Sequence, residues 1–394
     1  MRQPEADLQQ FAVTHAPQPD PRDDVPQAPT SPLFTPLVVG ALSLSHRVVM
    51  APLSRLRARE MDGSVTCQMV RYYARRATQG GLIVAEALAV SPQGVAQTGT
   101  PCMFDPAHAN GWRAVTGAVH RRGGIIIAQL WHGGRLARAP DATRQIVSAS
   151  AIRAKGLTYA PAPQAESAEL PVELDEDGID SIIDQYRQAA EFASDAGFDG
   201  VEMHCANGCL ADQFLHDGSN HRSDDYGGSF EGRTRFLKDA VQTLSSVWGA
   251  ERVGVRLSPF GLINDVHDSD TVHLFSHVLK CLQNEGVAYV HLMEARAGAG
   301  FASPRLAGSA PEIAQTFRSH FSRVIIASGN FDAARANAAI VDGSVDAVSF
   351  GRAFLSHPDL PSRLAAGGAI AAAKHEDYFP ARVNRPAPDT ATED

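Results

Sequence analysis

From Arg47 onward, short runs of apolar residues alternate with longer stretches that are apolar on one face only. Runs that are apolar throughout are typical of strands buried on both faces, as in a parallel sheet covered by helices. The strand-like runs are Val48–Pro52, Leu82–Ala87, Ile125–Trp131, Gly200–His204, Val253–Ser258, Ala288–Met293, Val324–Ser328 and Ala347–Gly351. The helix-like stretches, whose apolar residues recur at helical spacing, are Gln68–Thr78, Pro106–Arg122, Ile179–Ala196, Phe230–Val247, Asp270–Asn284, Pro311–His320 and Asp332–Val341, with a weaker one after Pro358.

This alternation predicts an α/β fold with right-handed crossovers, and eight units in a row favour a single-domain (β/α)₈ barrel, the TIM barrel. The rival is an open, doubly wound sheet, which usually carries a glycine-rich phosphate turn after its first strand. Here the first strand is followed by Pro52, Leu53, Ser54 and Arg55, without a GxGxxG pattern. We therefore expect the closed barrel.

The barrel is predicted to occupy residues 31–380. Residues 1–30 are rich in Pro, Asp, Gln and Ala and have too little apolar surface to order, so we expect a disordered extension there. Residues 381–394 are expected to form a flexible tail. The longest connection, residues 132–175, would lie over the carboxyl ends of the strands and could act as a lid.

Composition narrows the function classes. The 394 residues carry a net charge of -9, which disfavours a nucleic-acid partner. No apolar run is long enough to predict a transmembrane helix or a secretory signal. The five cysteines are scattered, which favours reduced thiols in a cytoplasmic compartment. We therefore expect a soluble enzyme with no membrane partner.

Catalytic residues of a barrel lie at the carboxyl ends of its strands, and phosphate sites often follow strands seven and eight. Gly329 and Asn330 follow the seventh predicted strand, and Gly351 and Arg352 follow the eighth. Glycines let backbone N–H groups approach an anion, and an arginine supplies a forked cation. A single glycine here would read as an ordinary turn, but the two turns together favour a phosphate site.

His204 and Asn207 follow the fourth strand, and a helical turn there would point both side chains the same way. Together they could donate hydrogen bonds to one carbonyl oxygen and stabilise developing negative charge. A lone histidine is more often structural, so the pair carries this inference. Arg256 is either a partner for an anionic cofactor atom or an ordinary ion-pair residue, and a buried Gln129 would need hydrogen-bond partners.

These motifs together resemble the Old Yellow Enzyme family of FMN-dependent ene reductases, from about Leu33 to Leu364. The matching segments are RVVMAPLSR, YYARRA, GGLIVAEALAVSPQG, GWRAVTGAVHRRGG, AQLWHGGR, HCANGCLADQFL, SDDYGGSFEGRTRF, GVRLSPFG, ASGNF and FGRAFLSHPDL. Their order and spacing make the resemblance specific.

The resemblance implies non-covalent FMN at the barrel mouth, with NADPH or NADH as reductant. The ring contacts that it implies are Pro52, Leu53 and Ser54 at one edge, Ala87 and Gln129 at the pyrimidine portion, and Arg256 near N1 and C2=O. The phosphate contacts that it implies are Gly329, Asn330, Gly351 and Arg352. The substrate contacts that it implies are His204 and Asn207 at the carbonyl oxygen and Trp131 in the pocket wall.

The implied reaction is ping-pong transfer of a hydride from NAD(P)H, through flavin N5, to the β-carbon of an activated alkene such as an enone, enal or nitroalkene. The family usually has Tyr two residues after the Asn as proton donor, and this chain has Cys209. In this it resembles a minority branch of the family, which includes morphinone reductase and also has Cys at this position. We therefore expect water or another group to supply the proton, while Cys209 shapes the pocket. Tyr378 is a weaker candidate donor.

Three other functions stay open at this point. An FMN-dependent dehydrogenase could work in the oxidative direction, and a flavin-binding barrel could be non-catalytic. A metal-dependent barrel hydrolase could use His132, His204, Cys205 and Cys209, although successive strand residues point to opposite sides. The expected partner is a small α,β-unsaturated molecule, and the chain is expected to be a monomer or homodimer.

Overall fold

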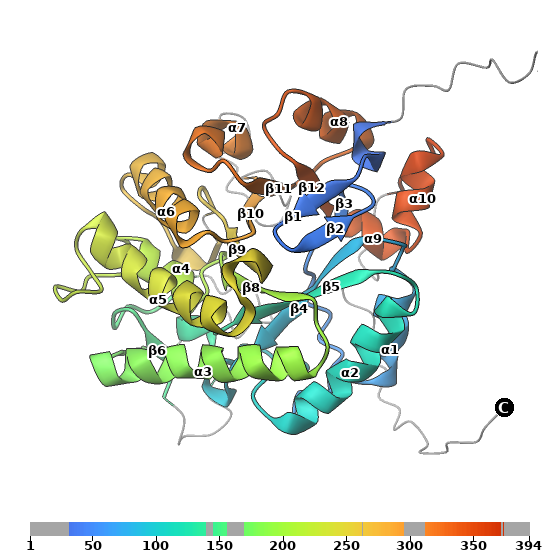
Figure 1. Ribbon diagram of the computed structural model, residues 1–394. Coiled ribbons are helices and arrows are strands. Elements are labelled where there is room, and N and C mark those ends of the chain that lie inside the picture. The colour runs from blue at the N-terminus through green and yellow to red at the C-terminus, as the bar shows by residue number, and fades with distance from the viewer. Residues whose placement is uncertain are drawn as a thin grey trace, which may run out of the picture. The chain divides into compact units, whose positions relative to one another are not determined.

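A closed barrel of eight parallel strands forms the centre of the molecule, with helices around it (Figure 1). The computed structural model describes residues 31–138, 145–155, 169–261, 263–294, 312–371 and 373. The barrel strands, in spatial and sequence order, are β3 (Val48–Met50), β4 (Leu82–Ala89), β5 (Ile125–Trp131), β8 (Gly200–Cys205), β9 (Val253–Leu257), β10 (Tyr289–Met293), β11 (Val324–Ser328) and β12 (Ala347–Phe350), and β12 pairs with β3 to close the ring. The predicted (β/α)₈ barrel is confirmed.

The covering helices lie close to the predicted amphipathic stretches. They are α1 (Cys67–Ala74), α2 (Pro106–His120), α3 (Glu176–Asp195), α5 (Phe230–Trp248), α6 (Thr271–Glu285), α7 (Ile313–Phe317), α8 (Ala333–Val341) and α10 (Leu360–Ala365). Local signals set their starts. The Asp105 side chain accepts from the Ala107 backbone N–H at 2.8 Å before α2, and Ser229 caps α5 in the same way at the Gly232 N–H.

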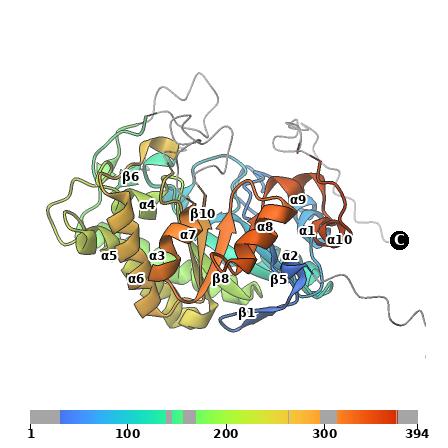
Figure 2. The same ribbon diagram turned by 90° about the horizontal axis from the view of Figure 1, so that it is seen from above.

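Four further pieces of structure were not expected from the sequence pattern. They are a hairpin of β1 (Leu37–Val39) and β2 (Leu42–Leu44), a small sheet of β6 (Val147–Ser148) and β7 (Val172–Glu173), and the short helices α4 (Leu210–Leu215) and α9 (Arg352–Ser356). The hairpin closes the amino-terminal end of the barrel, since Ala41 donates to the Glu251 carbonyl just before β9. Figure 2 shows β1 on the opposite side of the barrel from β6 and α4.

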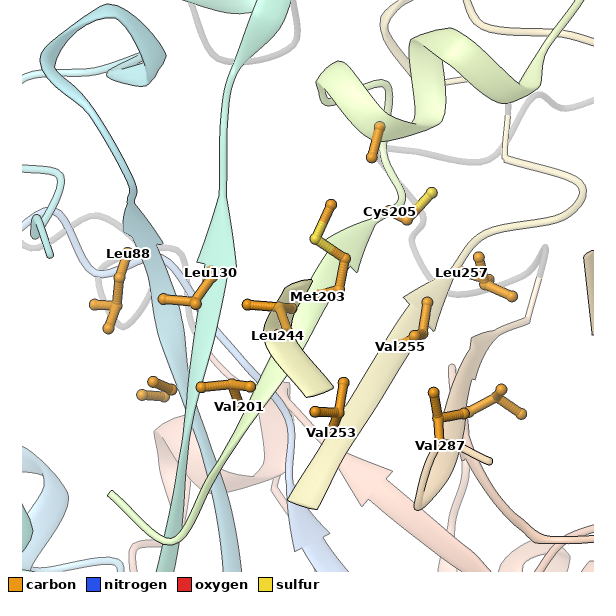
Figure 3. Close-up of a cluster of buried hydrophobic side chains, with 14 of the residues drawn as sticks. Leu88, Leu130, Val201, Met203, Cys205, Leu244, Val253, Val255, Leu257 and Val287 are labelled. Carbon is orange, nitrogen blue, oxygen red and sulfur yellow. The ribbon is translucent and has the colours of Figure 1, made fainter. Parts of the chain in front are cut away.

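The main apolar core lies between the strands and the helices. Leu130, Val201, Met203 and Val255 point outward from the barrel and pack with Leu244 of α5 (Figure 3). Each such fully buried aliphatic side chain stabilises the fold by about 1.5–3 kcal/mol relative to exposure. Because side chains alternate along a strand, the neighbours of these residues point into the barrel.

The barrel interior changes from apolar to polar along the strand direction. Near the hairpin it contains a second apolar cluster that includes Val49, Leu82, Val84, Ile127 and Ile326. Towards the carboxyl ends of the strands, the inward positions carry the buried polar residues Gln129, Glu202, His204, Arg256 and His291. The buried polar side chains of the barrel interior are therefore concentrated at the carboxyl ends of the strands, which is where a functional site is expected.

Several expectations concern residues outside the described ranges. The expected extension 1–30, the tail 381–394 and Tyr378 all lie there, as do residues 139–144 and 156–168 of the long connection. The lid role of residues 132–175 stays a prediction. Among the helices that the structure describes, none combines the length and the apolar character needed to cross a membrane.

Candidate functional site at the barrel mouth

The predicted site residues gather at the carboxyl ends of seven of the eight barrel strands. Because the strands are parallel, all of these ends meet at one mouth. The residues are Pro52, Leu53 and Ser54 after β3, Ala87 on β4, Gln129 and Trp131 on β5, His204 on β8 with Asn207 and Cys209 after it, Arg256 on β9, Gly329 and Asn330 after β11, and Gly351 and Arg352 after β12.

Strand register places several of these residues directly beside one another. Ala87 of β4 lies opposite Gln129 of β5, and His204 of β8 lies opposite Arg256 of β9. Partners in register on neighbouring parallel strands project to the same face. The register slips between Val84 and Ala87, and this irregularity in β4 is what brings Ala87, rather than Glu86, level with Gln129.

His204 is buried and its Nδ1 has no hydrogen-bond partner among the described residues. Its ring lies edge-on to Trp131, with 6.2 Å between ring centroids. Burial lowers the pKa of His204 to about 3, and the positive charge of Arg256 adds to the effect. The imidazole is therefore neutral at ordinary pH, and a neutral imidazole can donate one hydrogen bond without adding a charge to the site.

Asn207 lies in a tight turn and not on a helix. Its φ of 58° is left-handed, and helix α4 begins only at Leu210, so a helical turn does not align Asn207 with His204. The turn is held by its backbone, which donates to the Ser258 hydroxyl at 2.9 Å and accepts from the Asn264 amide at 2.8 Å. Its Oδ1 is buried without a partner among the described residues, so the side chain has hydrogen-bonding capacity left for a ligand.

The Cys209 thiol is buried and already engaged. Its Sγ donates to the backbone carbonyl of His204 at 2.9 Å, and it packs with Ala87 and Trp131 in a small apolar cluster. Burial, with a further contribution from the Asp212 carboxylate, raises the pKa of the Cys209 thiol to about 12. A thiol in this setting is a weak acid, and it links the turn after β8 to the strand that carries His204.

Gln213 of α4 ties three loops at the mouth together, and the sequence pattern did not reveal it. The fully buried side chain donates to the carbonyls of Gly133 and Gly208, at 3.2 and 2.7 Å. Its Oε1 accepts from the Ser148 hydroxyl at 2.9 Å and from the Arg135 N–H at 3.2 Å. The sequence feature that could have pointed to Gln213 is a glutamine among apolar residues in a short helix, since a buried amide must have hydrogen-bond partners.

Glu86 performs a similar task for the loop after β3. It accepts from the Arg55 backbone N–H at 2.8 Å and from the Tyr73 hydroxyl at 3.1 Å. Burial raises the pKa of Glu86 to about 7, although these hydrogen bonds act in the opposite direction. The carboxyl group therefore anchors the loop that carries Pro52 and Leu53, which are half-buried, and Ser54, which is exposed.

The turns after β11 and β12 lie side by side. Gly329 and Asn330 have φ values of 134° and 51°, in the region that favours glycine and asparagine. The Arg335 guanidinium braces this turn by donating to the Gly329 carbonyl at 3.0 Å, and the Arg352 guanidinium contacts the Asn330 side-chain oxygen. Any side chain at Gly351 would crowd Leu53, because its Cβ would lie 3.2 Å from the leucine Cδ2. The two glycine turns and the Arg352 guanidinium therefore lie together at the position where the sequence predicts a phosphate site.

The low pKa of His204 leads to a pH prediction. Since His204 stays neutral above about pH 3, the reduction of an enone should show no inflection near pH 6.5 caused by this residue. The rate of the enone half-reaction should be measured from pH 5 to 8 for the wild type and for His204→Asn. We expect parallel profiles, and a wild-type inflection near pH 6.5 that disappears in His204→Asn would contradict the neutral assignment.

The comparisons with known proteins decide the family. The model of the NADH:flavin oxidoreductase / NADH oxidase family matches residues 32–369. The chain belongs to this family. It is 39% identical to 12-oxophytodienoate reductase 1 of Oryza sativa subsp. japonica, covering 86% of this chain and 87% of the relative. The old yellow enzyme homologue from Zymomonas mobilis has a similar structure, with a TM-score of 0.82, 36% identity, and coverage of 88% of this chain and 96% of the homologue.

A third match is morphinone reductase in complex with tetrahydroNAD, with a TM-score of 0.78, 38% identity, and coverage of 88% of this chain and 93% of the match. The chain is therefore an NAD(P)H-dependent flavin oxidoreductase of the Old Yellow Enzyme family, and its cofactor is FMN. The mouth fits this cofactor. The left-handed turn at Gly329 and Asn330 lies beside the Arg352 guanidinium, a combination that suits a phosphate group.

Proposed function

We propose that this flavin oxidoreductase is an ene reductase that reduces the C=C bond of an alkene conjugated to an electron-withdrawing group. The observation that carries the proposal is the buried His204 imidazole near the end of β8, whose Nδ1 has no partner among the described residues, with the Asn207 side chain in the turn that follows. Two relatives named as reductases, 12-oxophytodienoate reductase 1 and morphinone reductase, support it. Bound FMN would supply the two-electron carrier between NAD(P)H and the alkene β-carbon.

In this proposal the chain's own residues have distinct tasks. His204, through a ring N–H, and Asn207, through its amide NH₂, donate to the substrate carbonyl oxygen and stabilise the negative charge that develops there. Trp131 forms part of the wall of the substrate pocket. The remaining residues hold the cofactor: Pro52, Leu53, Ser54, Ala87, Gln129 and Arg256 at the ring, and Gly329, Asn330, Gly351 and Arg352 at the phosphate. Tyr378 stays a candidate substrate contact.

In this proposal the proton for the alkene α-carbon comes from water or from another group, and not from Cys209. The Cys209 thiol is a poor donor, because it is buried and its hydrogen already bonds to the His204 carbonyl. Its role in the proposal is to shape the pocket next to Trp131.

Replacing Cys209 with alanine should leave turnover and FMN binding largely unchanged. The reason is that alanine keeps the apolar contacts of the cluster and removes only a thiol that donates no proton in the reaction. Steady-state turnover of 2-cyclohexenone and FMN content should be measured for both proteins, with Cys205→Ala, on the outer face of β8, as a matched control. Loss of turnover with normal FMN content in Cys209→Ala alone would assign the proton donation to the thiol.

The proposed function has a direct test. The purified protein should be reduced anaerobically with NADH or NADPH and then titrated with 2-cyclohexenone while the visible flavin spectrum is recorded. We expect the enone to reoxidise the flavin stoichiometrically and to be converted to cyclohexanone. A reduced flavin that the enone leaves reduced, together with aerobic oxidation of an organic substrate without added nicotinamide, would favour the oxidative dehydrogenase instead.

Among the described residues, no group of three or more His, Cys, Asp or Glu side chains is placed to hold a metal ion. Two of the residues considered for a metal site, His204 and Cys205, lie on opposite faces of β8, because Cys205 packs in the outer core (Figure 3). The hydrolase alternative therefore gains no support from the site geometry.

A further inference from the structure

A buried carboxylate, Glu202, lies inside the barrel directly behind the mouth. Its side chain is fully buried and accepts three hydrogen bonds, from the Gln129 amide at 2.6 Å, the Tyr289 hydroxyl at 3.0 Å and His291 Nδ1 at 3.0 Å. Glu202 lies in register with Gln129 on the neighbouring strand. Gln129, which is assigned above to the cofactor, is a direct partner of this carboxylate.

The surroundings of Glu202 are built to keep it ionised. Burial alone would raise its pKa, but His291, Arg256 and the Gln129 hydrogen bond outweigh that effect and hold the pKa of Glu202 below its usual value. Burial lowers the pKa of His291, while the Glu202 carboxylate acts in the opposite direction; Nδ1 donates to Glu202 and Nε2 lies 2.7 Å from the Ser349 hydroxyl. Gly254 makes room for the Tyr289 ring, since a Cβ there would lie 2.1 Å from it.

An ionised carboxylate can only accept hydrogen bonds, so the group that Gln129 turns towards Glu202 must be its NH₂. The amide carbonyl oxygen of Gln129 is then the end that does not face Glu202. A ligand at the mouth meets a defined acceptor rather than an amide that could present either end. The imide N–H of a flavin pyrimidine is a donor of the matching kind.

We propose that Glu202 is a positioning residue that orients the Gln129 amide, so that its carbonyl oxygen accepts from the flavin imide N–H, and that offsets the charge of Arg256 beside the ring. The proposal rests on the placement of FMN given above. It predicts two separable effects of Glu202: one on the strength of FMN binding through orientation, and one on the flavin midpoint potential through charge.

Glu202→Gln removes the charge and lets the facing amides pair in either orientation. We expect it to weaken FMN binding to the apoprotein by about tenfold or more, the size of a lost hydrogen bond to a charged group. Because a negative charge near the ring disfavours the anionic reduced flavin, its removal should raise the midpoint potential. A tenfold change in relative affinity for the two redox forms corresponds to about 30 mV for a two-electron couple.

The matched control is Tyr289→Phe, which removes another hydrogen bond to Glu202 but keeps the charge and the contact with Gln129. It should leave the potential unchanged. FMN affinity is measured by fluorescence quenching on the apoprotein, and the potential by titration of the holoprotein with a reference dye. If Glu202→Gln weakens both redox forms equally and leaves the potential unmoved, Glu202 is merely structural and the proposal fails.

A second measurement does not depend on folding of the Glu202 variant. The infrared spectrum of the wild type should contain no band from a protonated carboxylic acid that moves in Tyr289→Phe. Such a band would show that Glu202 is neutral, which removes both the orientation and the charge argument. A wild type that binds no FMN would overturn the proposed function itself, whereas normal FMN binding in Glu202→Gln would overturn only this inference.

Discussion

Replacing His204 with alanine is expected to lower kcat/KM for 2-cyclohexenone by about 10²- to 10³-fold, the usual effect of losing one preorganised donor to a developing oxyanion. The buried imidazole is neutral and its Nδ1 has no partner among the described residues, so it has a hydrogen bond to give. Asn207→Ala should have an effect of the same order. Steady-state kinetics with the enone, under anaerobic conditions, measures both.

A loss of kcat/KM in these two variants must be distinguished from a loss of bound FMN. FMN content should remain that of the wild type, and Cys209→Ala, which changes a neighbouring side chain without removing a proposed donor, serves as control. The double variant should lose less than the product of the single losses, because residues that bind one atom act as a unit. Wild-type enone turnover in His204→Ala with normal FMN content would remove His204 from the substrate site.

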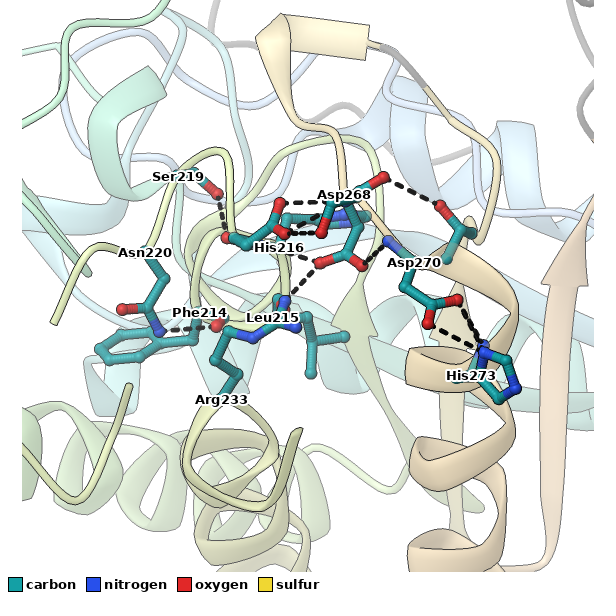
Figure 4. A network of polar contacts seen from close by, with 12 residues as sticks. Phe214, Leu215, His216, Ser219, Asn220, Arg233, Asp268, Asp270 and His273 are labelled. Carbon is teal, nitrogen blue, oxygen red and sulfur yellow. Dashed lines mark hydrogen bonds and ion pairs between the residues drawn. The ribbon is translucent and has the colours of Figure 1, made fainter. Parts of the chain in front are cut away.

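Replacing Asp268 with asparagine is expected to lower the free energy of unfolding by about 3–5 kcal/mol, the cost of leaving a buried charge without its partner. The Asp268 side chain is buried, although the residue as a whole is partly exposed, and it pairs with the nearly buried Arg233 of α5 (Figure 4). The carboxylate also accepts from the backbone N–H groups of Asp217 and Asp270, at 3.0 and 2.8 Å. This network ties the segment after α4 to the start of α6.

The matched control is an exposed pair on the surface of α3. Arg187 and Asp184 lie 2.7 Å apart, with side chains 41% and 49% exposed, so water screens their attraction. Asp184→Asn should therefore cost less than about 1 kcal/mol. Equilibrium urea unfolding of the holoproteins at saturating FMN measures both, and equal small losses in the two variants would mean that the Asp268 pair contributes little.

The eight barrel strands could be read from the chain because each is a continuous run of apolar residues that must be buried on both faces. Ile125–Trp131 and Val324–Ser328 agree with the structure at both ends. The hairpin Leu37–Leu44 escaped prediction, because its strands are three residues long and are held by contacts with Glu251, far along the chain. Short elements of this kind carry too little local pattern to be recognised alone.

The candidate site divides in the same way. The strand ends, the paired glycine turns and the His204–Asn207 spacing could be identified in the sequence. They could be assigned to one site because the carboxyl ends of all strands of a (β/α)₈ barrel lie at the same end of the barrel. The left-handed turn at Asn207 was not, and neither were the partners of Gln213 and Glu202. Glu202 did leave a signal, a carboxylate within a strand buried on both faces.

By itself the sequence determined the barrel, its order of strands and which side chains could meet at its mouth, because apolar periodicity and strand direction are local properties. Only the tertiary structure decided the state of those side chains. Burial makes His204 neutral and the Cys209 thiol a weak acid, and neighbours on other strands keep Glu202 ionised. Solvation and charge come from residues that are distant in the chain, so no local pattern can contain them.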